Sequence, residues 1–179
     1  DGRRFTSENF KTHALYYELT VYDSHRLRFP RVPAFWIFDR RRMSAGPLPL
    51  QLAGPSGPVQ LYKWSKDNSV ELAKGWIVQG EGIADLAEKL GVPAGNLVET
   101  VERYNAYCAR GEDPEFGRRP VDLAPLCHPP YFALRLYPGG PNTQGGPRRN
   151  HRAQVLHVDG RPIPRLNAAG EFGSVYGML

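Results

Sequence analysis

The sequence predicts an α+β fold in which a pair of adjacent helices packs with a small sheet. Residues 83–90 and 94–109 each place apolar side chains at helical spacing, with only a short turn between them. Short apolar runs at 34–38, 75–79 and 131–136 are separated by segments rich in glycine and proline, as the strands of a small sheet are. The chain has 179 residues, which is the size of one domain or slightly more.

The two helices are the clearest elements. The first has an apolar face and is followed by Gly91, the residue type that most often ends a helix. That face consists of Ile83, Leu86, Ala87 and Leu90. The second helix follows Pro93 and ends before Gly111, and its stripe consists of Leu97, Val98, Val101, Tyr104 and Cys108. We interpret both stripes as core and not as a cofactor-binding surface.

The chain before the helix pair is less regular. Residues 34–38, Ala-Phe-Trp-Ile-Phe, are typical of a buried strand. Residues 16–21 are apolar but fit a helix and a strand equally well. Residues 44–60, and residues 112–130 beyond the pair, contain so many prolines and glycines that we expect irregular structure there.

The last third of the chain predicts a loop followed by a hairpin. Residues 138–146 hold four of the chain's 19 glycines and two prolines, which predicts a loop of set shape with little side-chain bulk. Strands at 154–158 and 161–164 flank Asp159-Gly160, the strongest two-residue hairpin signal. Residues 166–170 are expected to form a further strand or its end.

The charge pattern does not favour a nucleic-acid partner. The formal net charge is +5, and arginines cluster at 40–42, 118–119 and 148–149. These clusters are short and dispersed, and acidic residues lie among them, so a small anionic ligand or a solvated surface fits better.

Several common features are absent from the sequence. It has no run of 18 apolar residues, no signal peptide, no Walker loop and no dinucleotide fingerprint. Cys108 and Cys127 lie far apart without metal-ligand spacing, which suits a reducing cytoplasm, although two cysteines also allow a disulfide. The chain opens on Asp1-Gly2 without an initiator residue, so we expect it to be a piece of a longer protein.

Six segments then follow in a recognisable order. They are Asp1-Gly2-Arg3-Arg4-Phe5 with Glu8; the helix pair with Tyr104-Asn105 and the run Gly111–Arg118; Pro130-Tyr131-Phe132-Ala133; Thr143-Gln144-Gly145-Gly146; Asp159-Gly160-Arg161-Pro162-Ile163-Pro164; and Ala168-Ala169-Gly170-Glu171. No segment is specific alone. Together they resemble the FAD-dependent oxidoreductase 2 family, which includes fumarate reductase/succinate dehydrogenase flavoproteins and 3-ketosteroid dehydrogenases.

The resemblance implies a layout of domains. In that family a cap domain interrupts the FAD-binding α/β domain, and substrate binds between the two. Residues 1–9 match the end of the first FAD-domain segment, 10–125 the cap with its helix pair and small sheet, and 126–179 the returning, truncated FAD-domain strands. The remainder of the FAD-binding domain is then an expected partner of this chain.

The resemblance also implies FAD as the cofactor of the full-length protein. Two segments are expected to contact the flavin: Thr143, Gln144, Gly145 and Gly146 in the glycine loop, and Ala169, Gly170 and Glu171 after the hairpin. A carboxylate such as that of Glu171 accepts hydrogen bonds from hydroxyl groups. Because this chain matches only part of the FAD site, we expect weak or no FAD binding by these residues alone.

The sequence departs from the family pattern at three places. Asn142 stands where fumarate reductases carry a substrate-binding histidine, and residues 9–13 contain no arginine where those enzymes carry a catalytic one. Asn167 replaces the family's usual tyrosine. These departures argue against fumarate reduction, while Asn142 remains a candidate substrate contact.

The resulting hypothesis is an enzyme that moves a hydride between flavin and a carbon–carbon bond of a small organic substrate. His13, Tyr16 and Tyr17 lie near the expected domain junction and are the local candidates for proton transfer or substrate contact. The alternative is a non-catalytic binding or interaction domain that uses the helix pair as its contact surface.

Overall fold

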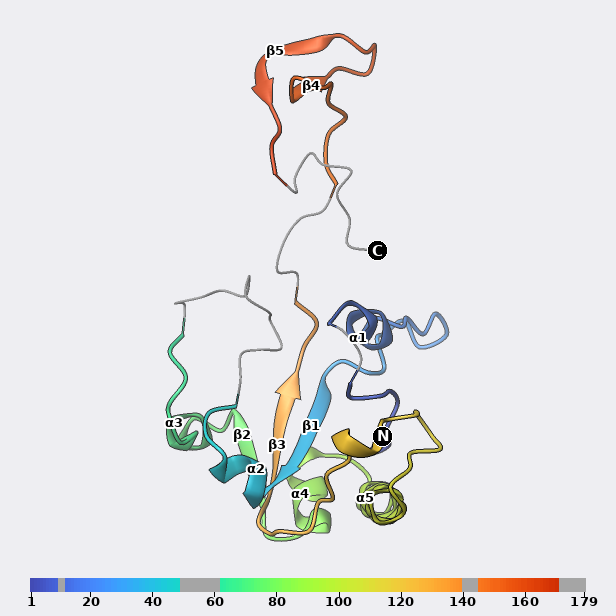
Figure 1. Ribbon diagram of the computed structural model, residues 1–179, viewed down its shortest axis with the longest axis vertical. Helices are drawn as coiled ribbons and strands as arrows, with labels where there is room; N and C mark the ends of the chain where they lie inside the picture. Colours follow the sequence, from blue (N-terminus) through green and yellow to red (C-terminus); the bar gives the residue numbers. More distant parts are fainter. Residues whose placement is uncertain (10–11, 49–61, 140–144, 171–179) are drawn as a thin grey trace. The chain divides into compact units, whose positions relative to one another are not determined.

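The computed structural model describes residues 1–9, 12–48, 62–139 and 145–170 (Figure 1). They fall into two compact units, the first of the described residues up to Gly139 and the second of residues 145–170. The mixture of helices and small antiparallel sheets confirms the α+β class. The predicted boundary between residues 125 and 126 stays a prediction.

The first unit is built on a three-stranded antiparallel sheet. Its strands are β1 (Ala34–Asp39), β3 (Tyr131–Leu136) and β2 (Ile77–Gly80), in the order β1-β3-β2. Strand β2 starts later than the sequence predicts, because Gly75 adopts a left-handed φ of 72°. The amide of Trp76 then donates to the carbonyl of Glu71, so Gly75 and Trp76 belong to a turn and not to the strand.

Both faces of this sheet are covered, which explains why its strands read as continuous apolar runs. On one face Phe38, Ile77 and Phe132 form a core with Leu48. On the other face Ala133 lies beneath Leu86 and Leu90, and the half-buried residues Phe35, Ile37 and Val78 pack there too. Successive side chains of β1 therefore alternate between two cores, as strand geometry requires.

The covering helices are α4 (Ile83–Leu90) and α5 (Ala94–Arg110), at the bottom of the view (Figure 1). Gly91 and Gly111 end them with φ values of 70° and 72°, as the sequence predicts. Leu86 and Ala87 are fully buried, and the two helices share a core through Ala87, Leu97 and Val101. Both predicted stripes are therefore core.

The opposite face of the sheet is covered by irregular chain and two short helices that the sequence did not reveal. These are α2 (Arg40–Ser44) and α3 (Ser69–Ala73). The side chain of Asn68, directly before α3, is fully buried. It makes four hydrogen bonds to the chain segments that surround the two short helices. Its oxygen accepts from the Leu48 amide and the Trp64 indole, and its nitrogen donates to the carbonyls of Met43 and Gly46.

The ambiguous stretch near the start is helical. Helix α1 spans Thr12–Leu19, and Thr20 ends it by donating its amide and its hydroxyl to the Tyr16 carbonyl. The part of the ambiguous stretch up to Leu19 therefore belongs to a helix of eight residues. A short 3₁₀ turn, η2 (Pro120–Asp122), is the regular piece within the otherwise irregular 112–130.

The second unit contains the predicted hairpin, formed by β4 (Gln154–Leu156) and β5 (Pro162–Asn167). Its loop is not the predicted two-residue turn. His157 and Arg161 pair instead across three loop residues, and the amide of the last of these, Gly160 with a φ of 87°, donates to the His157 carbonyl. The predicted strand at 166–170 is the end of β5, which stops at Asn167.

Candidate functional site

The N-terminal motif and the run Gly111–Arg118 meet in space, although more than a hundred residues separate them. The Arg4 guanidinium donates two hydrogen bonds to Asp113 at 2.8 and 3.2 Å and two to Glu8, both at 2.9 Å. It lies between the rings of Tyr104 and Phe116, 4.9 and 4.8 Å from their centroids. These bonds attach the first residues of the chain to α5 and the loop after it.

The charges of this cluster reinforce one another. Burial alone would lower the pKa of Arg4, but hydrogen bonds to Asp113 and Glu8 outweigh it and raise that pKa. The hydrogen bond from Arg4 in turn lowers the pKa of Asp113. Arg118 extends the cluster by donating to Glu8 and to the Tyr104 hydroxyl, both at 3.0 Å. The motif residues here have a structural role.

Helix α1 carries the three candidate catalytic residues. Tyr16 and Tyr17 lie edge to face with ring centroids 5.9 Å apart, and their exposed fractions are 45% and 73%. His13 lies in the first turn of the same helix. The structure thus places the three predicted residues on one short helix.

Two further aromatic residues missed by the sequence reasoning follow this helix. Tyr22 and Phe29 are exposed, and their rings pack 5.1 Å apart across a tight turn. Asp23 makes that turn by accepting from the amides of His25 and Arg26. The pattern Tyr-Asp-Ser-His was the available signal, since Asp followed by Ser is typical of turns.

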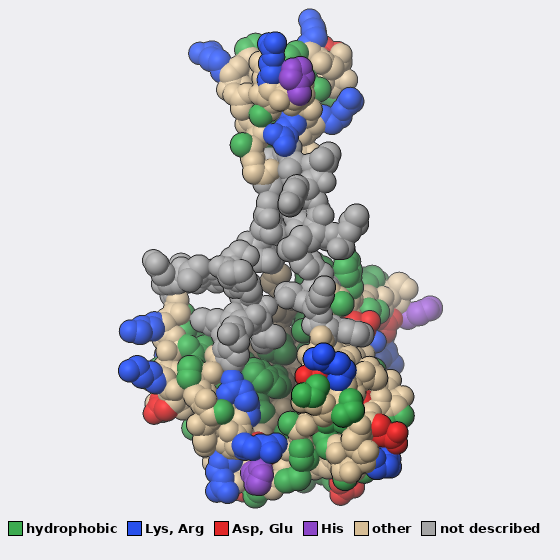
Figure 2. Space-filling model, viewed as in Figure 1, with side chains coloured by type: hydrophobic (Ala, Val, Ile, Leu, Met, Phe, Trp, Pro, Cys, Tyr) green, Lys and Arg blue, Asp and Glu red, His purple; other side chains and the backbone are tan. Residues whose placement is uncertain are grey.

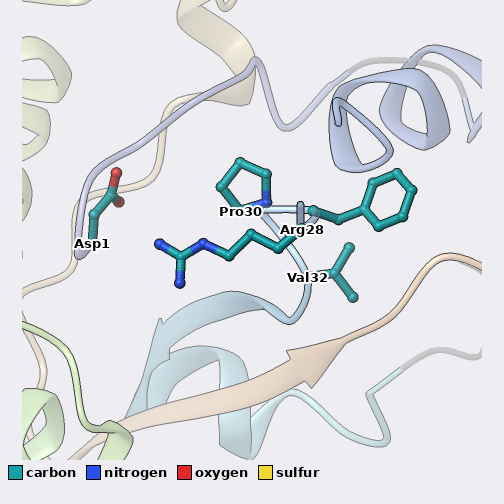
Figure 3. A pocket seen from close by; sticks show the side chains of 5 residues that line it. Asp1, Arg28, Pro30 and Val32 are labelled. Carbon is teal, nitrogen blue, oxygen red and sulfur yellow. The ribbon is translucent and has the colours of Figure 1, made fainter. Parts of the chain in front are cut away.

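An open hollow of about 510 Å³ lies beside the same segment (Figure 3). Its lining combines a charged side, Asp1 and Arg28, with apolar Phe29, Pro30 and Val32. In the close-up the Arg28 side chain extends from its loop in the direction of Asp1.

The second unit holds the parts of the predicted flavin segments that the structure describes. Gly145 and Gly146 have φ values of 82° and 143°, and Gly170 has a φ of 67°, a backbone region that favours glycine. No atom of the described residues lies within 4 Å of the position that a Cβ would take at Gly145 or at Gly170. Ala169 is exposed. The remaining candidates, Asn142, Thr143, Gln144 and Glu171, lie outside the described residues.

Hydrogen bonds connect the two glycine-containing segments within this unit. The Arg149 side chain, three residues after Gly146, donates to the Ala168 carbonyl at 3.2 Å. The Ala168 amide donates to the Ala153 carbonyl at 2.9 Å, so the end of β5 is tied to the turn before β4. These bonds join the chain shortly after Gly146 and the turn before β4 to the residue that follows β5.

Basic side chains are numerous in the second unit, but they do not form one stripe. Figure 2 shows them standing out on several sides. They are Arg148, Arg149, Arg152, Arg161 and Arg165, all exposed. Arg161 is neutralised locally by Asp159, at 2.6 Å. The expected lack of a nucleic-acid partner stays a prediction.

Comparison with known proteins decides the family. A family model described as an FAD binding domain matches residues 1–178. The chain belongs to this FAD-binding family. It is also 32% identical to the 4-oxocyclohexanecarboxylate 2-dehydrogenase of Sinomonas cyclohexanicum, over 94% of this chain and 29% of that protein.

Solved structures show the same relationship for this FAD-binding chain. A 3-ketosteroid delta1-dehydrogenase from Sterolibacterium denitrificans in complex with 1,4-androstadiene-3,17-dione matches with a TM-score of 0.68 and 27% identity. That match covers 97% of this chain and 32% of the other. The open conformation of a flavocytochrome c3 fumarate reductase matches with a TM-score of 0.56 and 26% identity, over 98% and 26%.

These matches confirm the predicted family and its flavoprotein character. They also show that the chain spans less than a third of the length of the relatives named here. In its described residues, this FAD-binding chain has no group of three or more candidate metal ligands and no helix long and apolar enough to cross a membrane.

The described residues fit a flavin in one respect. A planar ring system packs against bare backbone only where no side chain intervenes, and Gly145 and Gly170 leave that space free. Their positive φ values also exclude most other residues without strain. The contact of these glycines with a flavin stays a prediction.

Proposed function

We propose that this chain provides the substrate-covering region and part of the flavin-binding region of an FAD-dependent oxidoreductase. The match of the FAD-binding family over residues 1–178 is the observation that carries this proposal. Bound FAD would supply the hydride acceptor or donor. In this proposal residues 1–9 and 126–179 belong to the flavin domain and residues 10–125 to the cap, and the protein acts in the cytoplasm.

The flavin would contact Thr143, Gln144, Gly145 and Gly146 on one segment and Ala169, Gly170 and Glu171 on the other. The hydrogen bonds between Arg149 and Ala168 and between Ala168 and Ala153 support this assignment, because they connect the chain that follows the first segment with the residue directly before the second. The bare backbone at Gly145 and Gly170 leaves room for a ring system.

The substrate class we favour is a cyclic ketone that loses hydrogen from the carbon–carbon bond beside its carbonyl group. Two of the relatives named above act, by their names, on ring ketones, one a 4-oxocyclohexanecarboxylate and one a 3-ketosteroid. The lack of arginine in residues 9–13 and Asn142 in place of histidine weigh against a fumarate-like dicarboxylate.

The chain's own residues would orient this substrate and move its proton. Dehydrogenation removes a hydride from one carbon and a proton from its neighbour, so the enzyme needs a group that takes the proton. His13, Tyr16 and Tyr17 are the candidates in this chain, and Asn142 is the candidate for a hydrogen bond to the substrate. The exposed rings of the two tyrosines offer aromatic surface to an apolar ring.

The flavin assignment is tested in the full-length protein with two glycine variants. We expect Gly145→Ala to weaken FAD binding on the order of tenfold, because a Cβ at positive φ strains the backbone and narrows the approach to it. Gly160→Ala is the matched control. Gly160 has a similar φ of 87°, lies in the same unit, and has equally open surroundings.

FAD content per protein after purification, and the dissociation constant from flavin fluorescence, give the readout. We expect the Gly160 variant to retain FAD. Equal loss of FAD in both variants would contradict a contact at Gly145. It would show that a Cβ at positive φ destabilises the second unit as a whole, and that FAD is lost for that reason. A full-length protein without flavin would exclude the enzyme and favour a non-catalytic binding domain.

A further inference from the structure

Arg31 is one side chain that connects helix α1 to the rest of the first unit. Its Nη1 atom donates to the Glu18 carbonyl oxygen at 2.9 Å and to the Glu18 carboxylate at 2.5 Å. The same guanidinium lies over the ring of Phe5, 5.0 Å from its centroid. Arg31 comes directly before the Val32–Pro33 entry into β1, so one side chain joins three segments.

The position of this contact on the helix matters. The last carbonyls of a helix have no partner within it, and positive charge is favourable at that end. In α1, Thr20 satisfies the Tyr16 carbonyl and Arg31 satisfies that of Glu18. The tyrosines lie within two residues of the anchored Glu18, and therefore in the turn whose orientation Arg31 controls.

The other side of the contact is itself immobilised. Phe5, on which Arg31 stacks, follows Arg4, and Arg4 is bonded to Asp113 and Glu8. The Arg4 side chain is 9% exposed and that of Asp113 is fully buried. A continuous series of contacts therefore runs from the loop after α5, through Arg4 and Phe5, to Arg31 and the C-terminal turn of α1.

We propose that Arg31 is a positioning residue that fixes helix α1 and thereby sets the placement of Tyr16 and Tyr17. Its consequence for catalysis rests on the proposed function, which places the two tyrosines at the substrate. Its structural part, the anchoring of α1, is independent of any substrate. Arginine suits the role better than lysine, because its planar guanidinium lies over an aromatic ring while one of its nitrogens donates to the Glu18 carbonyl and carboxylate.

The first test measures hydrogen exchange of backbone amides in the full-length protein. Arg31→Ala removes all three contacts, and we expect the amides of residues 14–20 to exchange on the order of tenfold faster, with those of α4 and α5 unchanged. Arg31→Lys, which keeps the charge and loses the fork, should lie between. Arg26→Ala is the control, since Arg26 is 67% exposed and has only a 3.9 Å ion pair with Asp23 on its own turn.

The second test separates positioning from folding. With the ring ketone that the full-length enzyme turns over, we expect Arg31→Ala to lower kcat/KM by about 10- to 100-fold, the range that a small misplacement produces. Combined with Tyr16→Phe and Tyr17→Phe, its effect should be smaller than the sum of the separate effects, because the residues act through one helix. FAD content should remain that of the unaltered protein.

Unchanged exchange in residues 14–20 would overturn the proposal, whether or not any ketone is turned over. Faster exchange with unchanged kcat/KM, or fully additive effects with the tyrosine variants, would overturn the link from Arg31 to the tyrosines. Faster exchange in α5 as well would assign Arg31 to general stability instead. If no ketone is turned over, the exchange measurement alone decides whether Arg31 anchors α1. Failure of the proposed function can therefore be distinguished from failure of the proposal for Arg31.

Discussion

Tyr16 and Tyr17 each combine an aromatic ring with a hydroxyl group, and replacement by phenylalanine removes only the second. If one of the hydroxyls moves the substrate proton, its Phe variant should lose on the order of 100-fold in kcat with little change in KM. Steady-state kinetics of the two single variants measures this. Two variants with unaltered kcat would show that the rings contribute packing alone.

Arg4 is the residue on which the start of the chain depends. Arg4→Ala would leave the buried carboxylate of Asp113 without its partner, so we expect the free energy of unfolding to fall by about 3 kcal/mol. Chemical denaturation of the full-length protein gives this value. Arg119→Ala is the control, because Arg119 is 75% exposed and pairs only with nearby Asp122. An effect no larger than that of the control would contradict the assigned role of Arg4.

Protonation of the Glu71 carboxylate is expected to lower the stability of the fold at acidic pH. Burial would raise its pKa, but hydrogen bonds from Ser65 and Tyr62 outweigh burial and lower the pKa from 4.5 to about 2. The folded state therefore gains stability from the charged carboxylate above about pH 4.5, and loses it as pH falls toward about 2. Denaturation at several pH values should show this loss, and Glu71→Gln should reduce it. Identical pH profiles would contradict the prediction.

At the scale of the elements, the junction of β2 with α4 leaves no space for a side chain at Gly80. A Cβ at Gly80 would lie 2.6 Å from the Leu86 amide nitrogen and 2.7 Å from its Cα, both backbone atoms that have little freedom to move. We expect Gly80→Ala to cost about 1–3 kcal/mol of stability. Gly95→Ala, within α5 and with open surroundings, should instead be neutral or slightly stabilising. A tolerated alanine at position 80 would contradict this packing.

The elements also show what the sequence can predict. Helices α4 and α5 were predictable because their apolar spacing and their terminal glycines agree. Strands β1 and β3 were predictable from continuous apolar runs, since both faces of the sheet are buried. The short helices α2 and α3 were not, because five residues are too few to show a period, and α3 depends on the distant contacts of Asn68.

The candidate site was predictable only in part, for a physical reason. The glycines at 145, 146 and 170 are recognisable because positive φ leaves glycine as the favoured residue. Arg31 gave no local signal, because its role depends on Glu18 and Phe5, which reach it only in the folded chain. The Arg4 motif was noticed, but its bond to Asp113 spans a separation that no sequence pattern encodes.

At the scale of the whole molecule, the two units divide the proposed work. The first unit carries helix α1 and its anchors, and the second carries the glycine segments assigned to the flavin. The two ring-ketone relatives named above are more than three times as long as this chain, and we propose that the complete active site also includes residues outside these 179. For this reason the decisive experiment uses the full-length protein.

That experiment is the anaerobic mixing of the purified full-length protein with a ring ketone while its visible flavin absorption is recorded. We predict a yellow protein whose flavin is bleached by 4-oxocyclohexanecarboxylate or by 4-androstene-3,17-dione, with formation of the unsaturated ketone, and is not bleached by succinate. A colourless protein from which no FAD is extracted would contradict the proposal of a flavin-dependent enzyme. A flavin that succinate bleaches and both ketones leave oxidised would contradict the proposal that its substrate is a ring ketone.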